Sequence, residues 1–162
     1  MRFLYLIALL FMDNAFASND KIETQDIASE ELRCLSMNIY FEARGEPTAG
    51  QVAVAMVTMN RVLSKRYPSS VCKVVWQRRQ FSWTHDGRSD RPKDRKAWIL
   101  AQKIAEFVHS KYATYNNLSN GALDLTNGAL HYYAPKLADP RWSRHKEVTR
   151  EIGNHRFMKS RS

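Results

Sequence analysis

The chain has 162 residues, of which 44% are hydrophobic and 25% charged, and its formal net charge is +9 at pH 7. This length is sufficient for one domain with a hydrophobic core, and the composition excludes a disordered or low-complexity protein. The positive charge suits an anionic polymer as partner, but charge alone does not distinguish a cell wall from nucleic acid or anionic lipid.

The first 17 residues have the pattern of a signal peptide. Arg2 precedes an unbroken apolar run from Phe3 to Met12, and Ala15-Phe16-Ala17 forms the small-x-small pattern of a cleavage site. The run is about half of the roughly 20 residues that a permanent membrane helix needs. The sequence therefore predicts export to the periplasm or beyond, with no stable membrane insertion once residues 1–17 are removed. Residues 18–28 are predicted to be a flexible leader, and residues 29–162 a single domain.

Cys34 and Cys72 are the only cysteines. In an oxidising compartment they can form one intramolecular disulfide, which we predict; two buried free thiols are the alternative. No closely spaced histidines accompany them, so they do not indicate a zinc site.

Three longer helices and one short helix are expected in the first two-thirds of the chain. The first predicted helix covers residues 29–44, with Ser29 as a favourable N-cap. Residues 48–63 form the second and are apolar nearly all round, as in a buried central helix. Ser70 is predicted to cap a short helix that reaches Trp76. Residues 94–112 carry apolar side chains at helical spacing and form the last predicted helix.

Short strands are expected mainly in the last third. Residues 81–84 alternate aromatic and polar side chains before a turn, and residues 129–134 form a second aromatic-rich candidate strand. Residues 147–152 and 155–158 flank Gly153-Asn154, the pattern of a two-residue hairpin turn. The fold class predicted is α+β, with helices mainly N-terminal and a small antiparallel sheet near the C-terminus.

Glu42 continues an apolar stripe along the first predicted helix. Leu32, Leu35 and Ile39 precede it at helical spacing, so its carboxyl leaves the helix on the core-facing side. Partial burial raises the pKa of a carboxyl and keeps it protonated, as a general acid for glycosidic cleavage requires. The alternative is a salt bridge, for example to Arg44 or Arg61.

Glu46 is the obvious second carboxylate for a two-carboxyl glycosidase mechanism. Its alternative role is structural, because Glu46-Pro47 places negative charge at the start of the second predicted helix.

Aromatic residues interleaved with polar ones indicate a saccharide groove, because rings cover the apolar faces of sugars while polar groups bind hydroxyls. Each aromatic residue could instead belong to the core. The aromatic candidates are Phe81, Trp83, Tyr132, Tyr133 and Trp142, with Ser82, Thr84, Asn127 and His131 between them.

Other chemistries find little support in the sequence. It contains no His-Glu-x-x-His pair, no Gly-rich phosphate loop and no serine nucleophile elbow. The five histidines are scattered, so neither a metal nor a cofactor is predicted. The basic stretch within residues 78–96 suits a solvated surface better than a nucleic-acid site.

Several motifs resemble those of the SleB/CwlJ family of cell wall hydrolases, which includes spore cortex-lytic enzymes. The most specific is the run from Asn38 to Pro47, Asn-Ile-Tyr-Phe-Glu-Ala-Arg-Gly-Glu-Pro. The resemblance covers about residues 32–158. The other matching motifs are Gly50 to Ala55, Asn60-Arg61, Phe81-Ser82-Trp83 with Asp86-Gly87, Gly128-Ala129-Leu130 with Tyr132-Tyr133, and Ile152 to Phe157.

The resemblance implies a single catalytic domain related to lysozymes and lytic transglycosylases, with Glu42 as catalytic acid. Such enzymes are thought to cut between N-acetylmuramic acid and N-acetylglucosamine without water, leaving a 1,6-anhydro end. One carboxyl then suffices as acid and base. The substrate-binding candidates are Glu46, Phe81, Ser82, Trp83, Tyr132, Tyr133 and His155.

The sequence differs from the spore enzymes by its two cysteines and by having no separate peptidoglycan-binding repeat, which favours a periplasmic enzyme of a Gram-negative cell. We expect a monomer that acts on peptidoglycan strands. Two alternatives remain: a metal-dependent amidase that cuts the glycan–peptide bond, and a non-catalytic wall-binding protein.

Overall fold

The computed structural model describes residues 26, 28–118 and 124–161, with the backbone alone for 112–118. The predicted signal peptide and almost all of the predicted leader lie outside the described residues. None of the helices in the described ranges is long and apolar enough to cross a membrane.

The first helix includes residue 26 and residues 28–43. It begins before Ser29, so Ser29 lies within the helix and the predicted N-cap is wrong. Glu31 in its second turn accepts hydrogen bonds from the backbone N–H groups of Val71 (2.5 Å) and Cys72 (3.3 Å). The same region carries the Cys34–Cys72 disulfide that the sequence predicted, with a Cα–Cα distance of 5.2 Å. The first helix is thus joined to the segment around Val71 and Cys72.

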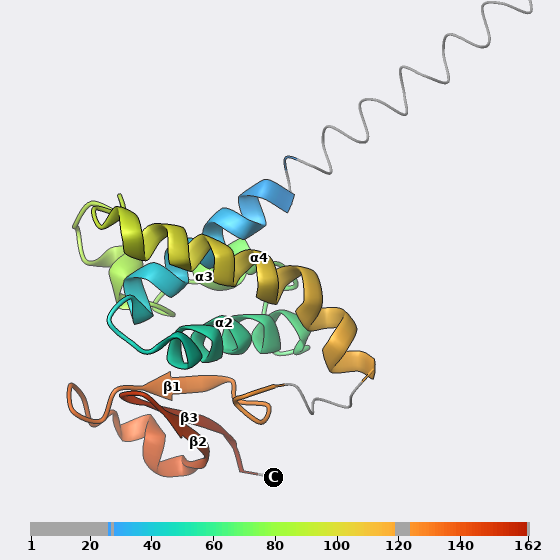
Figure 1. Cartoon of the computed structure of the whole chain (residues 1–162). Coiled ribbons are helices and arrows are strands. Elements are labelled where there is room, and N and C mark those ends of the chain that lie inside the picture. The colour runs from blue at the N-terminus through green and yellow to red at the C-terminus, as the bar shows by residue number, and fades with distance from the viewer. Residues whose placement is uncertain (1–25, 27, 119–123, 162) are drawn as a thin grey trace, which may run out of the picture.

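Helix α2 (Thr48–Leu63) has the predicted bounds and is the central helix of the fold. Its small and β-branched side chains are buried almost all round, including Ala53, Val54 and Val57 at 0% exposure. In Figure 1, α2 lies between helix α4 (Arg95–Leu118) on one side and the sheet on the other. Helix α3 (Val71–Val75) is capped by the preceding Ser70, whose side chain accepts a hydrogen bond from Lys73 N, as predicted.

The predicted strand at residues 81–84 is wrong, because Ser82–His85 form the 3₁₀ helix η1. Alternation of buried Phe81 and Trp83 with exposed Ser82 fits both structures. Two hydrogen bonds, one local and one to a distant residue, decide between them. Thr84 Oγ1 donates to Phe81 O at 2.9 Å, and the buried Trp83 Nε1 donates to Asn38 Oδ1 at 3.3 Å. Asn38 Nδ2 in turn donates to Thr58 Oγ1 of α2 at 3.1 Å, so η1, the first helix and α2 are joined inside the core.

The C-terminal part forms a three-stranded antiparallel sheet in the order β1-β3-β2. Its strands are β1 (His131–Tyr133), β2 (Lys146–Ile152) and β3 (His155–Ser160), and the 3₁₀ helix η2 (Arg141–His145) precedes β2. The predicted hairpin is present, with Gly153 at φ 61° in its turn. The α+β class predicted from the sequence is confirmed.

Two groups of buried side chains form the core. The larger lies among the helices, and the smaller lies between α2 and the sheet, where Phe157 at 0% exposure packs with Val54 and Val57. Burying one such large apolar side chain stabilises the fold by roughly 1.5–3 kcal/mol. Because both groups meet at α2, the C-terminal end of the first helix is held against β1, where the candidate site lies.

Candidate active site

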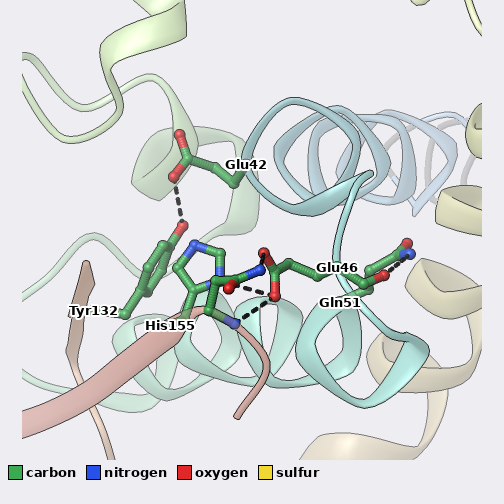
Figure 2. A network of polar contacts seen from close by, with 6 residues as sticks. Glu42, Glu46, Gln51, Tyr132 and His155 are labelled. Carbon is green, nitrogen blue, oxygen red and sulfur yellow. Dashed lines mark hydrogen bonds and ion pairs between the residues drawn. The ribbon is translucent and has the colours of Figure 1, made fainter. Parts of the chain in front are cut away.

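Glu42 lies in the last turn of the first helix and faces a cavity of about 380 Å³. Tyr132 on β1 donates a hydrogen bond through its hydroxyl to Glu42 Oε2 at 3.0 Å, and the other carboxyl oxygen points away from Tyr132 (Figure 2). Among the described residues that line this cavity, Glu42 is the only carboxylate. The lining residues are Glu42, Arg61, Arg79, Gln80, Phe81, His131, Tyr132, Trp142 and Lys146.

Burial raises the pKa of Glu42 above its ordinary value. The hydrogen bond from Tyr132 and the charge of Arg61 act in the opposite direction, but they do not outweigh burial. None of the salt bridges in the described part of the chain involves Glu42, so the predicted alternative of a salt bridge to Arg44 or Arg61 is wrong. The side chain is a half-buried carboxyl that keeps its proton to higher pH than an exposed one.

Arg61 of α2 supplies a buried positive charge to the wall of this cavity, with 3% of its surface exposed. Its Nε donates to Leu130 O at 2.8 Å, and its guanidinium lies over the rings of Phe81 (5.2 Å) and Tyr67 (5.5 Å). Arginine stays charged even though burial lowers its pKa. Arg61 therefore acts on Glu42 through space, as a charge that favours the carboxylate form.

Tyr132 and His131 bring two further polar rings to the same cavity from β1. Burial, followed by the charge of Glu42, raises the pKa of Tyr132 well above its usual range, so its hydroxyl remains a donor. Burial and the neighbouring cations, Lys146 first, lower the pKa of His131 to about 4. His131 is consequently a neutral imidazole near neutral pH, and its ring centroid lies 5.7 Å from that of Trp142.

Glu46 does not line the cavity around Glu42, although the sequence analysis placed it among the substrate-binding residues. Its carboxylate accepts hydrogen bonds from Asn154 N at 2.8 Å and Asn154 Nδ2 at 3.0 Å. Its backbone carbonyl accepts from Gln51 Nε2 at 3.0 Å. Burial alone would raise the pKa of Glu46, but the two hydrogen bonds from Asn154 and the charge of His155 lower it. The geometry favours the structural alternative: Glu46 braces the start of α2 against the β2–β3 turn.

His155, another predicted groove residue, is 8% exposed and lies between Tyr132 and Glu46 in Figure 2. Its ring meets Tyr132 edge to face with centroids 5.3 Å apart, and its Nδ1 is 3.9 Å from Glu46 Oε2. Burial lowers the pKa of His155 despite the Glu46 charge. We interpret His155 as a support behind Tyr132 and not as a group that meets a ligand.

The remaining predicted groove residues do not all line the same cavity. Phe81 lines the cavity of Glu42, whereas Ser82 and Trp83 line a second cavity beside it. Tyr133 lines neither of these two cavities; its ring packs on Trp142 at 5.7 Å and its hydroxyl accepts from Arg156 Nη1 at 3.2 Å.

Sequence reasoning did not predict Arg79, Gln80 or Lys146 as site residues. Arg79 has φ 62°, a strained backbone angle for a residue with a side chain, and such strain often marks a functional site. No local sequence signal separates these three from surface residues, because only the packing of η2 and the α3–η1 loop brings them to Glu42. In the described ranges, no three His, Cys, Asp or Glu residues lie together as a metal site.

Comparison with known proteins gives consistent matches. The sequence profile of the Cell Wall Hydrolase family matches residues 45–158, a segment that begins just after Glu42. A spore cortex-lytic enzyme of Bacillus cereus is 31% identical over 132 residues, covering 82% of this chain and 45% of the relative. One from Oceanobacillus iheyensis is 31% identical over 141 residues, covering 83% and 44%. This chain thus spans less than half the length of these curated relatives.

Two solved structures share the fold. The catalytic domain of the Bacillus cereus SleB protein is 29% identical, with a TM-score of 0.60 over 81% of this chain and 91% of that chain. The catalytic domain of a germination-specific lytic transglycosylase, SleB from Bacillus anthracis, is 30% identical, with a TM-score of 0.62 over 80% and 93%. The resemblance identified from the sequence motifs is confirmed.

Proposed function

The chain belongs to the Cell Wall Hydrolase family, and we propose that it is a lytic transglycosylase that cuts the glycan strands of peptidoglycan with Glu42 as acid and then base. The observation that carries the proposal is the half-buried Glu42 carboxyl, which faces a cavity whose other described lining residues are cationic, aromatic or neutral polar. The relatives support the class of substrate, since their names refer to the cortex of spores and to lytic transglycosylase activity.

The first step needs a protonated Glu42. Its carboxyl gives a proton to the oxygen between N-acetylmuramic acid and N-acetylglucosamine while the bond from that oxygen to C1 of the muramic acid breaks. N-acetylglucosamine leaves with a 4-hydroxyl, and positive charge develops at C1. The raised pKa of Glu42 serves this step because it keeps the acid protonated near neutral pH.

In the second step the 6-hydroxyl of the same muramic acid attacks C1, and the Glu42 carboxylate takes its proton. The product is a 1,6-anhydro end, no water is consumed, and Glu42 returns to its starting form. Between the two steps the carboxylate needs stabilisation. Tyr132, which donates to Oε2, and the nearby charge of Arg61 provide it. A two-carboxyl mechanism would need a second acidic group at the cavity, whereas Glu46 is bound to Asn154.

The enzyme acts outside the cytoplasm, in the periplasm or secreted, because peptidoglycan lies there and residues 1–17 have the pattern of a signal peptide. It acts as a monomer without cofactor. The lytic transglycosylase among the solved relatives favours glycan cleavage over the amidase and over a wall-binding protein without activity.

The test is mass spectrometry of purified sacculi digested with the enzyme and with Glu42→Gln. A lytic transglycosylase gives fragments with 1,6-anhydro ends and the variant gives none. Peptides released from intact glycan would indicate an amidase, and a complete lack of products from the unmodified enzyme would leave a binding protein. The control is Glu106→Gln, which makes the same change at an exposed position on α4.

A further inference from the structure

A second, larger cavity of about 770 Å³ lies beside the cavity of Glu42. The two have no described lining residue in common, but consecutive residues divide between them. Phe41 lines the second cavity and Glu42 the first, while Ser82 lines the second and Phe81 the first. Because consecutive Cα atoms are about 3.8 Å apart, the two cavities adjoin along the end of the first helix and the start of η1. We call the second one the basic cavity.

Cationic side chains outnumber carboxylates in the lining of the basic cavity by four to three. Four cations line it: Arg44, Arg88, Arg91 and Lys93. None of the salt bridges in the described part of the chain involves them.

Three aspartates also line the cavity, and two of them are bound to the backbone. Asp86 Oδ1 accepts from Arg88 N at 2.9 Å, and Asp94 Oδ1 accepts from Ala97 N at 3.0 Å at the start of α4. Asp86 and Asp94 therefore shape the loop and the helix start, and among the described residues no close ion pair with a carboxylate occupies the guanidinium groups of Arg44, Arg88 and Arg91.

The loop that carries Arg88, Arg91 and Lys93 is held to the rest of the fold at its C-terminal end. The hydroxyl of Tyr40, a residue only 4% exposed, accepts hydrogen bonds from Lys93 N and Asp94 N, each at 3.0 Å. Arg44 lies over the ring of the same Tyr40 at 5.1 Å. One buried phenol thus contacts Arg44 on one side of the cavity and the end of the loop that carries Arg88 and Arg91 on the other.

The inner wall of the basic cavity is aromatic. Phe41 and Trp83 stack with ring centroids 4.7 Å apart and an interplanar angle of 21°. A ligand that combines apolar side chains or sugar faces with carboxylates matches this combination of stacked rings and cations.

We propose that the basic cavity binds the anionic stem peptide of the glycan strand that Glu42 cuts. This inference rests on the proposed function. The bond that is cut starts at C1 of a muramic acid, and the peptide is attached through the lactyl group of a muramic acid. The peptide beside the scissile bond must therefore leave the sugar next to Glu42, where the basic cavity lies. Its free carboxylates fit Arg88 and Arg91, since guanidinium groups bind carboxylates in bidentate geometry.

The experiment compares two substrates that differ only in the peptide. One is purified glycan with its stem peptides, and the other is the same glycan after an amidase has removed them. Initial rates give kcat and KM for the unmodified enzyme, for Arg88→Gln with Arg91→Gln, and for a control that loses two charges elsewhere, Lys103→Gln with Arg150→Gln. All four positions are exposed, so the variants should fold, and thermal melting checks this.

The expected result is that the unmodified enzyme prefers the peptide-bearing glycan. The Arg88/Arg91 variant should lose this preference through a KM about tenfold higher, the size expected for two exposed ion pairs. Its rate on stripped glycan should stay unchanged, and the control should keep the preference. Equal rates on both substrates by the unmodified enzyme, or equal loss on both by the variant, would overturn the inference. Cleavage of neither substrate by the unmodified enzyme would instead refute the proposed function.

A binding measurement tests the same idea without catalysis. Titration calorimetry with a free stem peptide and with the same peptide amidated at its carboxylates should show weaker binding of the amidated form. In the Arg88/Arg91 variant the two peptides should bind alike. If amidation makes no difference to the unmodified protein, carboxylates are not what the basic cavity recognises.

Discussion

Replacing Tyr132 by phenylalanine isolates the contact on which the electrostatics of Glu42 depend. The variant keeps the ring, which packs on Phe157 (5.8 Å) and His155 (5.3 Å), and removes only the hydroxyl that donates to Glu42 Oε2. A hydrogen bond to a charged group has a net strength of about 1.5–3 kcal/mol. Part of this free energy favours the carboxylate over the acid, which is why the contact lowers the pKa of Glu42.

Two results are expected from Tyr132→Phe. The variant lacks the hydrogen bond that most lowers the pKa of Glu42, so burial raises this pKa further. Because the general acid must be protonated, the alkaline limb of the kcat/KM profile moves to higher pH. The maximum rate falls by about tenfold, equivalent to roughly 1.4 kcal/mol of lost stabilisation of the carboxylate between the two proton transfers.

The assay is the rate of release of soluble fragments from sacculi, measured over a pH series for the unmodified enzyme and the variant. Tyr133→Phe is the matched control, because it removes a hydroxyl from the neighbouring residue, whose partner is Arg156. The control should leave the alkaline limb in place. If the limb of Tyr132→Phe is unmoved, or moves to lower pH, then Tyr132 does not favour the ionised form of Glu42 and the reasoning is wrong.

Three further predictions concern Glu42, the Cys34–Cys72 disulfide and Gly153. Glu42→Gln should lower turnover by about 10²–10⁴-fold yet melt at the same or higher temperature near neutral pH. A raised folded-state pKa means that the ionised Glu42 destabilises the fold as pH rises above about 4.3, the ordinary value for glutamate; a lower melting temperature than that of Glu106→Gln would contradict this. Reduction of the disulfide, which closes a separation of 38 residues, should lower the free energy of unfolding by up to about 4 kcal/mol, measured by denaturant titration; an unchanged midpoint would show that the bridge adds no stability. Gly153→Ala should destabilise the fold, because its Cβ would overlap Glu46 Oε2 and its φ is 61°; an unaltered melting curve would mean that the brace is not needed.

The sequence predicted best those features that depend on local pattern. The bounds of α2 follow from a segment that is apolar nearly all round, and the β2–β3 hairpin follows from Gly153-Asn154 between two short runs. Helical spacing also placed Glu42 on the core-facing side of the first helix, whereas its role as catalytic acid came from the resemblance and stays a prediction. These signals need no knowledge of which distant segments meet.

Predictions failed or stayed incomplete where a distant contact decides the structure. Ser82–His85 form a 3₁₀ helix in which Trp83 donates to Asn38, a residue 45 positions earlier in the chain. Glu46 serves as a brace because Asn154, 108 positions later, donates to its carboxylate twice. The periodicity of hydrophobic residues cannot predict either of these two long-range contacts.

The central claim is that one carboxyl serves as acid and base while the sugar supplies its own nucleophile. Digestion of sacculi in water enriched in oxygen-18, followed by mass spectrometry of the new muramic acid ends, tests it most directly. The account predicts 1,6-anhydro ends that contain no heavy oxygen. New ends that carry one heavy oxygen each would mean that water attacks C1, and the single-carboxyl mechanism proposed for Glu42 would be contradicted.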